Sequence, residues 1–100
     1  MTIYELISYT VNFHSRAIND ALDKGHITQA VYLDKSVINY IDSNYNLGHI
    51  SEDAYRYFDK RLYLLAGQKL EIALLNADMS ILDKELISST SNRKGVKYDS

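Results

Sequence analysis

The tetrapeptide Gly-His-Ile-Thr/Ser occurs twice in this chain of 100 residues, starting at Gly25 and at Gly48. Glycine readily takes the left-handed conformation that closes a helix. The isoleucine two places later can pack back on the core, and Thr or Ser is a favoured first cap of a following helix. The repeat therefore predicts two tight helical hairpins. The sequences YLDK and YFDK also recur, but the two stretches align only with a two-residue gap. We therefore interpret the repeat as two similar turn signals rather than as a duplication.

The segments between these turns have the apolar spacing of three and four residues that marks amphipathic helices. Thr2 and Glu5 form a capping box before the first segment. Its polar side carries Glu5, Asn12, Arg16, Asn19 and Asp23. The chain contains no proline, so nothing forces a long helix to stop. We predict an all-α fold, an antiparallel bundle of three long helices at about 2–24, 28–46 and 51–78, with a short C-terminal helix at about 80–88.

Length and composition predict one soluble domain. Hydrophobic residues make up 46% of the chain and charged residues 24%, which is the balance of a globular protein. We assign residues 1–88 to the helical domain and the polar residues 89–100 to a flexible tail. The sequence has no cysteine, no apolar run long enough to span a bilayer and no basic start of a signal peptide. We therefore expect a cytoplasmic protein that does not enter a membrane.

Three ionisable residues fall where the helical pattern asks for apolar ones, namely His14, Asp34 and Asp59. With a rise of about 1.5 Å per residue, His14 and Asp59 come out level, and Asp34 about one turn away. A buried carboxylate is costly without a partner, so we predict a buried polar cluster that fixes how the helices pair. Partial exposure, a pH-sensing pair, a metal site or a catalytic dyad remain alternatives. The cluster lacks the Glu-x-x-His pairs of helical di-metal bundles, and we expect no metal and no cofactor.

The third predicted helix is apolar on two sides, and a helix of this kind is buried on both. The first two helices can cover the side that carries Leu62 and Leu70. The other side is the predicted interface, formed by Tyr57, Leu64, Leu65, Gln68, Ile72 and Leu75. It requires a homodimer or another protein partner, unless the short helix at 80–88 covers it.

Nothing in the sequence points to an enzyme, because it shows no phosphate-binding loop, nucleophile elbow or zinc-ligand spacing. The favoured function is a small interaction protein, such as a regulator, inhibitor or adaptor, that self-associates. Its short, Tyr-, Asn- and Ile-rich sequence would suit a phage or mobile element. The alternative is a nucleic-acid-binding regulator with a helix-turn-helix-like segment at 38–62. A net charge of −2, and acidic Glu52 and Asp53 at the head of the recognition helix, argue against phosphate contact.

Residues Asp59 to Leu70, DKRLYLLAGQKL, resemble the D-x-R-L-x-x-L-x-x-x-K-L pattern in the long helix of the Hha-type enterobacterial expression modulators. The resemblance covers about a dozen residues, many of them generic leucine, and the preceding helices do not align without a gap. It implies a small helical protein that binds nucleoid proteins, and thus a binding role rather than an enzymatic one. We assign no family from it.

Overall fold

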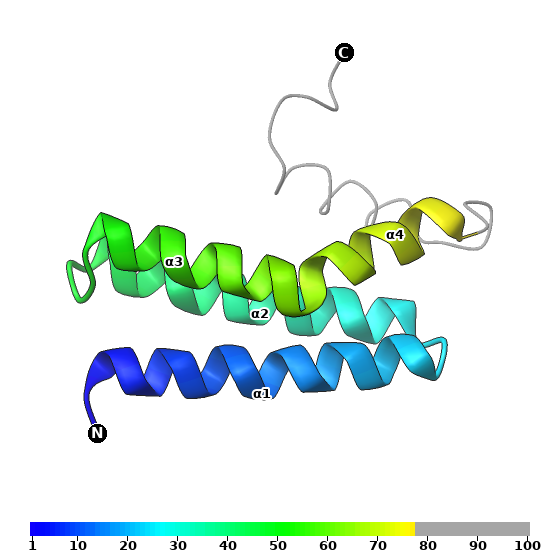
Figure 1. The fold of residues 1–100 in the computed structure, drawn as a ribbon, viewed down its shortest axis with the longest axis horizontal. Helices are drawn as coiled ribbons and strands as arrows, with labels where there is room; N and C mark the ends of the chain where they lie inside the picture. The colour runs from blue at the N-terminus through cyan, green and yellow to red at the C-terminus, as the bar shows by residue number, and fades with distance from the viewer. Residues whose placement is uncertain (78–100) are drawn as a thin grey trace, which may run out of the picture.

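The computed structural model describes residues 1–77, which form three helical rods. The first two rods are α1 (Ile3–Asp23) and α2 (Ile27–Asn46). The third is continuous and consists of α3 (Glu52–Leu62), the π-helical turn η1 (Tyr63–Gly67) and α4 (Gln68–Asn76). Figure 1 shows the rods side by side, with the chain reversing direction at each turn.

The all-α prediction is confirmed for residues 1–77, and the boundaries of the three long helices lie close to those predicted. The predicted helix at 80–88 and tail at 89–100 lie outside the described residues. Among the described helices, none is both long and apolar enough to cross a bilayer.

Both glycine turns have the same hydrogen-bonded geometry. Gly25 and Gly48 have φ angles of 77° and 78°. At the first turn the N–H of His26 donates to the carbonyl of Ala21 over 2.8 Å, and the N–H of Gly25 donates to that of Leu22 over 3.0 Å. The second turn repeats both bonds, with distances of 2.8 Å and 3.0 Å. This is the Schellman motif, and it explains why glycine occupies the same place in both turns.

The two turns differ in how the next helix begins. Ser51 caps α3, since its Oγ accepts a hydrogen bond from the N–H of Ala54 over 3.2 Å. The predicted cap at the equivalent Thr28 is wrong, because α2 already begins at Ile27 and its N-cap residue His26 makes no side-chain cap bond. The capping box of Thr2 and Glu5 at the start of α1 is confirmed, with bonds of 2.8 Å and 3.1 Å.

The core lies between the three rods and draws on all of them. Its largest fully buried apolar side chains are Ile7, Val11, Ile18, Val37, Ile41, Leu62 and Leu70. Burying a side chain of this size contributes roughly 1.5–3 kcal/mol relative to leaving it exposed. Hydrophobic burial along these facing stripes therefore holds the rods together.

The third rod packs a row of residues spaced at four, and this spacing explains its π-helical turn. Phe58, Leu62, Ala66 and Leu70 are all buried, and Leu74 packs beside them. A regular α-helix turns about 100° per residue, so each four-residue step drifts by about 40°. The π-turn, in which the N–H of Gln68 donates to the carbonyl of Tyr63, adds one residue to a turn. The extra residue rotates α4 back, so that the row stays on the core.

Candidate protein-interaction surface

The six residues of the predicted interface are all exposed on the third rod, and we call them the third-helix surface. Tyr57 lies on α3, Leu64 and Leu65 lie in the π-turn, and the other three lie on α4. The exposed fractions of the apolar members are 58% for Tyr57, 62% for Leu64, 40% for Leu65, 52% for Ile72 and 78% for Leu75. A row of large apolar side chains this open to solvent is typical of a binding surface.

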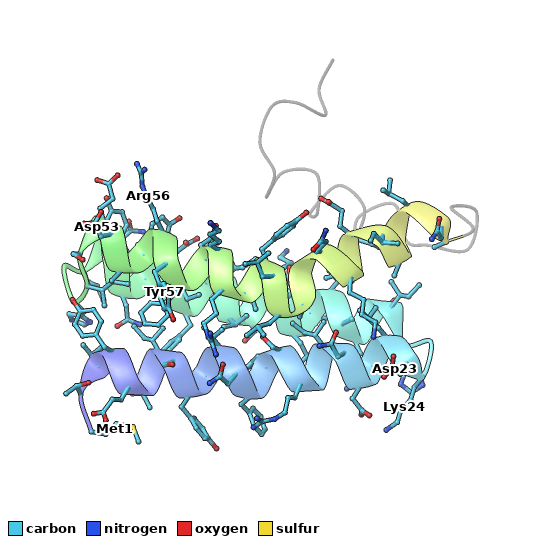
Figure 2. The ribbon with its side chains drawn as sticks, in the orientation of Figure 1. Met1, Asp23, Lys24, Asp53, Arg56 and Tyr57 are labelled. Carbon is cyan, nitrogen blue, oxygen red and sulfur yellow. The ribbon has the colours of Figure 1, made fainter. Side chains whose placement is uncertain are left out.

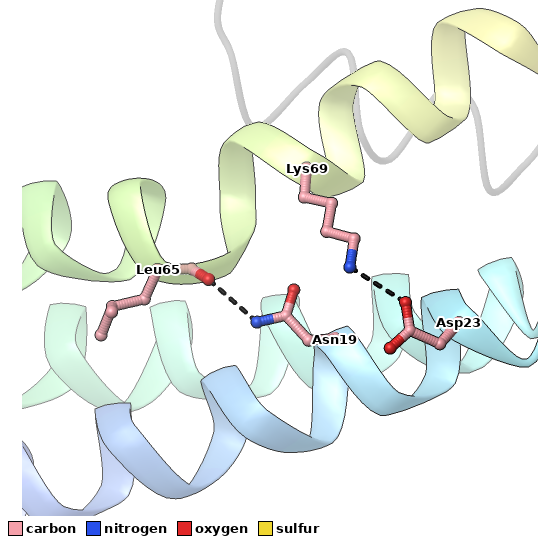
Figure 3. Close-up of polar contacts among 4 residues, drawn as sticks. All are labelled: Asn19, Asp23, Leu65 and Lys69. Carbon is pink, nitrogen blue, oxygen red and sulfur yellow. Dashed lines mark hydrogen bonds and ion pairs between the residues drawn. The ribbon is translucent and has the colours of Figure 1, made fainter.

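Leu65 lies at the edge of this surface that borders α1. Its backbone carbonyl accepts a hydrogen bond from Asn19 Nδ2 over 3.0 Å (Figure 3). One turn further on, Lys69 Nζ lies 3.0 Å from Asp23 Oδ1. The third-helix surface therefore ends at the α1 side in a polar seam.

Arg61 extends this seam in the opposite direction, where its guanidinium donates to Asn12 Oδ1 over 3.0 Å. The seam corrects the prediction that Asn12, Asn19 and Asp23 form the solvent side of α1, because these residues face the third rod. The hydrogen bonds and ion pair of the seam are exposed or partly buried, so each adds little free energy. Their main effect is to fix the position of α1 along the third rod.

Charged residues also border the other edge of the surface. Asp53 and Arg56 project from α3 away from α1, while Tyr57 lies toward it (Figure 2). Arg56 pairs with Glu52 one turn earlier. Lys60 is exposed between Tyr57 and Leu64 in sequence and has no ion-pair partner within residues 1–77. An apolar centre with a charged border is the usual anatomy of a protein interface.

A second group of exposed apolar residues lies on α1 and was not identified from the sequence. Leu6, Tyr9 and Phe13 are 41%, 58% and 51% exposed. The rings of Tyr9 and Phe13 stack with their centroids 6.1 Å apart. The spacing of these residues, by three and then four, was the available signal. It was missed because Leu6 also fits the apolar stripe of α1.

The structure does not bring His14, Asp34 and Asp59 together as one buried cluster. Asp34 is buried on α2, with 2% of its surface exposed. His14 is half-buried, and its Nδ1 lies 3.0 Å from the carbonyl oxygen of Thr10 on the same helix. Asp59 is only partly covered by its neighbours and forms no ion pair with His14. Within residues 1–77 there is no group of three acidic or histidine residues that could hold a metal ion.

Asp59 faces a carboxylate of α2 instead. Partial burial of the Asp59 carboxyl raises its pKa, and the nearby Asp42 carboxylate raises it further. Tyr55, one turn before Asp59, stacks on Tyr45 of α2 with ring centroids 4.5 Å apart. Burial, and then Asp42, also raise the pKa of Tyr55. This border of α2 and α3 is thus acidic and aromatic.

The other two histidines belong to the turns. His49 is exposed, and its Nδ1 lies 2.9 Å from Asn44 Oδ1 on the preceding helix. His26 is exposed at the start of α2. Each of these histidines lies one residue after a turn glycine.

Comparison of the chain with protein-family models, with curated proteins and with solved structures gives no match. The likeness of residues 59–70 to the Hha-type modulators therefore stays a hypothesis drawn from a short pattern. The case for a function rests on the geometry of the exposed surfaces.

Proposed function

We propose that this protein is a small non-enzymatic interaction module that pairs with a second copy of itself through the third-helix surface. The observation that carries the proposal is the exposure of Leu64, Ile72 and Leu75 along one rod. Burying apolar surface in an interface is favourable by roughly 25 cal/mol per Å². Three large side chains left in water on neighbouring turns therefore favour association.

A second copy is the proposed partner because three members of the surface are evenly spaced along the rod, with Gln68 in the middle. Leu64 and Ile72 lie four residues before and four residues after Gln68. In a two-fold interface each contact between two residues occurs twice, once in each direction. Two antiparallel third rods crossing at Gln68 would place Leu64 of each copy against Ile72 of the other. The two Gln68 amides would then meet at the axis, where they can bond to each other.

Residues 1–77 offer no observation that favours the nucleic-acid alternative. The helix-turn-helix-like segment at 38–62 includes the second glycine turn, and Glu52 and Asp53 are exposed in the first turn of α3. Carboxylates at the head of a recognition helix would repel DNA phosphates.

Self-association is tested by measuring the mass in solution of the wild type and of the Leu64→Glu/Ile72→Glu variant, using sedimentation or light scattering. We expect a dimer for the wild type and a folded monomer for the variant, because two charges per copy would enter an apolar contact. Tyr32→Glu is the matched control, since Tyr32 is 67% exposed on α2, outside the surface. It is expected to leave the dimer intact. A wild type that stays monomeric at high concentration refutes self-association.

The proposed axis is tested by crosslinking. The chain has no cysteine, so a single introduced thiol can react only with its counterpart in another copy. Gln68→Cys is expected to form a covalent dimer under mild oxidation, because residues on a two-fold axis approach within the roughly 7 Å Cα separation that a disulfide needs. Tyr32→Cys serves as the control and should crosslink poorly. Equal crosslinking of both variants would contradict the proposed arrangement.

A further inference from the structure

The π-helical turn lies at the centre of the third-helix surface, and the core packing of the third rod does not by itself fix where that turn must be. The core row Phe58, Leu62, Ala66, Leu70 repeats at intervals of four. The row that meets α1, formed by Arg61, Leu65 and Lys69, repeats at the same interval. One extra residue realigns the helix wherever it is placed, because each interval drifts by the same angle of about 40°.

Contacts outside the core row distinguish the observed position from the others. Asn19 of α1 donates its amide N–H to the carbonyl of Leu65, inside the π-turn, over 3.0 Å (Figure 3). On the outer side, the Tyr63 hydroxyl donates to Glu71 Oε1 over 3.1 Å, and this bond spans the turn. Gly67 is buried, and a Cβ there would lie 3.2 Å from Tyr63 Cδ1. Glycine thus lets the Tyr63 ring lie against the widened turn.

We infer that the π-turn can occupy either of two positions in the third rod, which we call registers. Asn19 is the main contact that holds it in the first register, at Tyr63–Gly67. In the second register the extra residue moves one interval toward the C-terminus, between Ala66 and Leu70. Leu62 and Leu70 remain on the core. The residues between the two positions, chiefly Gly67 and Gln68, rotate by up to about 100° relative to Leu64 and Ile72. The two registers therefore present two shapes of the same apolar surface.

Asn19 is assigned this role because its side chain, on another rod, donates a hydrogen bond to a backbone carbonyl inside the π-turn. The neighbouring seam contacts, at Arg61 and Lys69, are made through flexible side-chain ends, which can follow a rotation of the backbone. A hydrogen bond to a backbone carbonyl is lost when that carbonyl turns away. Asn19 therefore discriminates between the registers, and the Asn12–Arg61 contact does not.

The test is residue-by-residue amide hydrogen exchange by NMR in the full chain, comparing wild type, Asn19→Ala and the matched control Asn12→Ala. We expect Asn19→Ala to speed exchange across residues 63–70 by about five- to tenfold, the factor that corresponds to one lost hydrogen bond. We also expect a second set of signals for those residues, with α1 and α2 unchanged. Asn12→Ala should show neither effect. Exchange in Asn19→Ala that stays within about twofold of wild type across residues 63–70 overturns the inference.

Deleting Leu65 separates a register change from simple fraying. The deletion removes the surplus residue, so the third rod becomes a continuous α-helix that keeps Leu62 and Leu70 on the core. We expect this variant to unfold cooperatively, and to show one set of signals even when combined with Asn19→Ala. Deletion of the exposed Asn39 in α2, which has no π-turn to absorb it, should abolish folding. Failure of the Leu65 deletion to fold, or persistence of the second signal set, contradicts the proposal.

The inference does not depend on self-association for its readout. Amide exchange in the third rod reports the register whether the protein is a monomer or a dimer. A wild type that proves monomeric would therefore refute the proposed pairing and leave the register test standing. Unchanged amide exchange in Asn19→Ala would refute the register proposal and leave the proposed pairing standing.

Discussion

Replacing either turn glycine by alanine is expected to destabilise the fold by about 1 kcal/mol, and the structure supplies each part of that figure. Gly25 and Gly48 have positive φ angles of 77° and 78°, and nothing lies within 4 Å of a Cβ built on either. No clash contributes, so the cost is that of the left-handed conformation alone, roughly 1–2 kcal/mol. Alanine also restricts the unfolded chain, and this offsets about 0.4–1 kcal/mol of the lost stability. The double variant should lose about 2 kcal/mol, because the turns lie at opposite ends of the molecule and act independently (Figure 1).

The assay is urea unfolding followed by far-ultraviolet circular dichroism for the wild type, both alanine variants and their asparagine counterparts. Asparagine tolerates the left-handed region better than alanine does, so Gly25→Asn and Gly48→Asn should lose less stability. This order of stability, with glycine highest, asparagine next and alanine lowest, is expected only if the left-handed backbone conformation sets the cost. Alanine variants as stable as the wild type, or asparagine variants that lose as much as the alanine ones, would refute the argument from positive φ.

Two further predictions concern the third rod. Leu70 is 2% exposed and Tyr32, outside the third-helix surface, is 67% exposed, so Leu70→Ala should cost about 2–5 kcal/mol in urea unfolding and Tyr32→Ala less than about 0.5 kcal/mol; similar losses would show that the core has been misplaced. Partial burial and the Asp42 carboxylate raise the pKa of Asp59 above 3.8. Ionisation of this carboxyl therefore disfavours the folded state, and the stability of the protein falls as pH rises through the raised pKa. Asp59→Asn should therefore stabilise the protein near neutral pH and have little effect below 3.8, and an equal effect at both pH values would contradict this.

Much of the local structure can be predicted from the sequence, because it depends on bonds between near neighbours. The Schellman bonds at Gly25 and Gly48 join residues at most five apart, and the capping box at Thr2 spans three. Such bonds need no distant partner, so the turns and helix ends can be read from the residues themselves. The exposed side of the third rod was also predictable, because the rod carries more apolar residues than two neighbouring helices can cover.

The tertiary structure alone decided which residues complete the core side of the third rod. Asp59 was expected on the buried side with Leu62 and Leu70; both leucines are buried, but Phe58 and not Asp59 continues their row. A helix with apolar residues on two sides can be rotated either way, and the sequence does not say which side its neighbours will occupy.

The seam between α1 and the third rod shows the same limit. Asn12 and Asn19 are polar residues that suit solvent equally well in an isolated α1, and they face the third rod only because the rod supplies Arg61 and the carbonyl of Leu65. The π-turn also arises from this packing, because it keeps two rows spaced at four residues in contact with α1 and the core. Hydrogen bonds along the chain thus determine the helices and turns, while long-range packing determines their rotation, and the rotation decides which residues remain available to a partner.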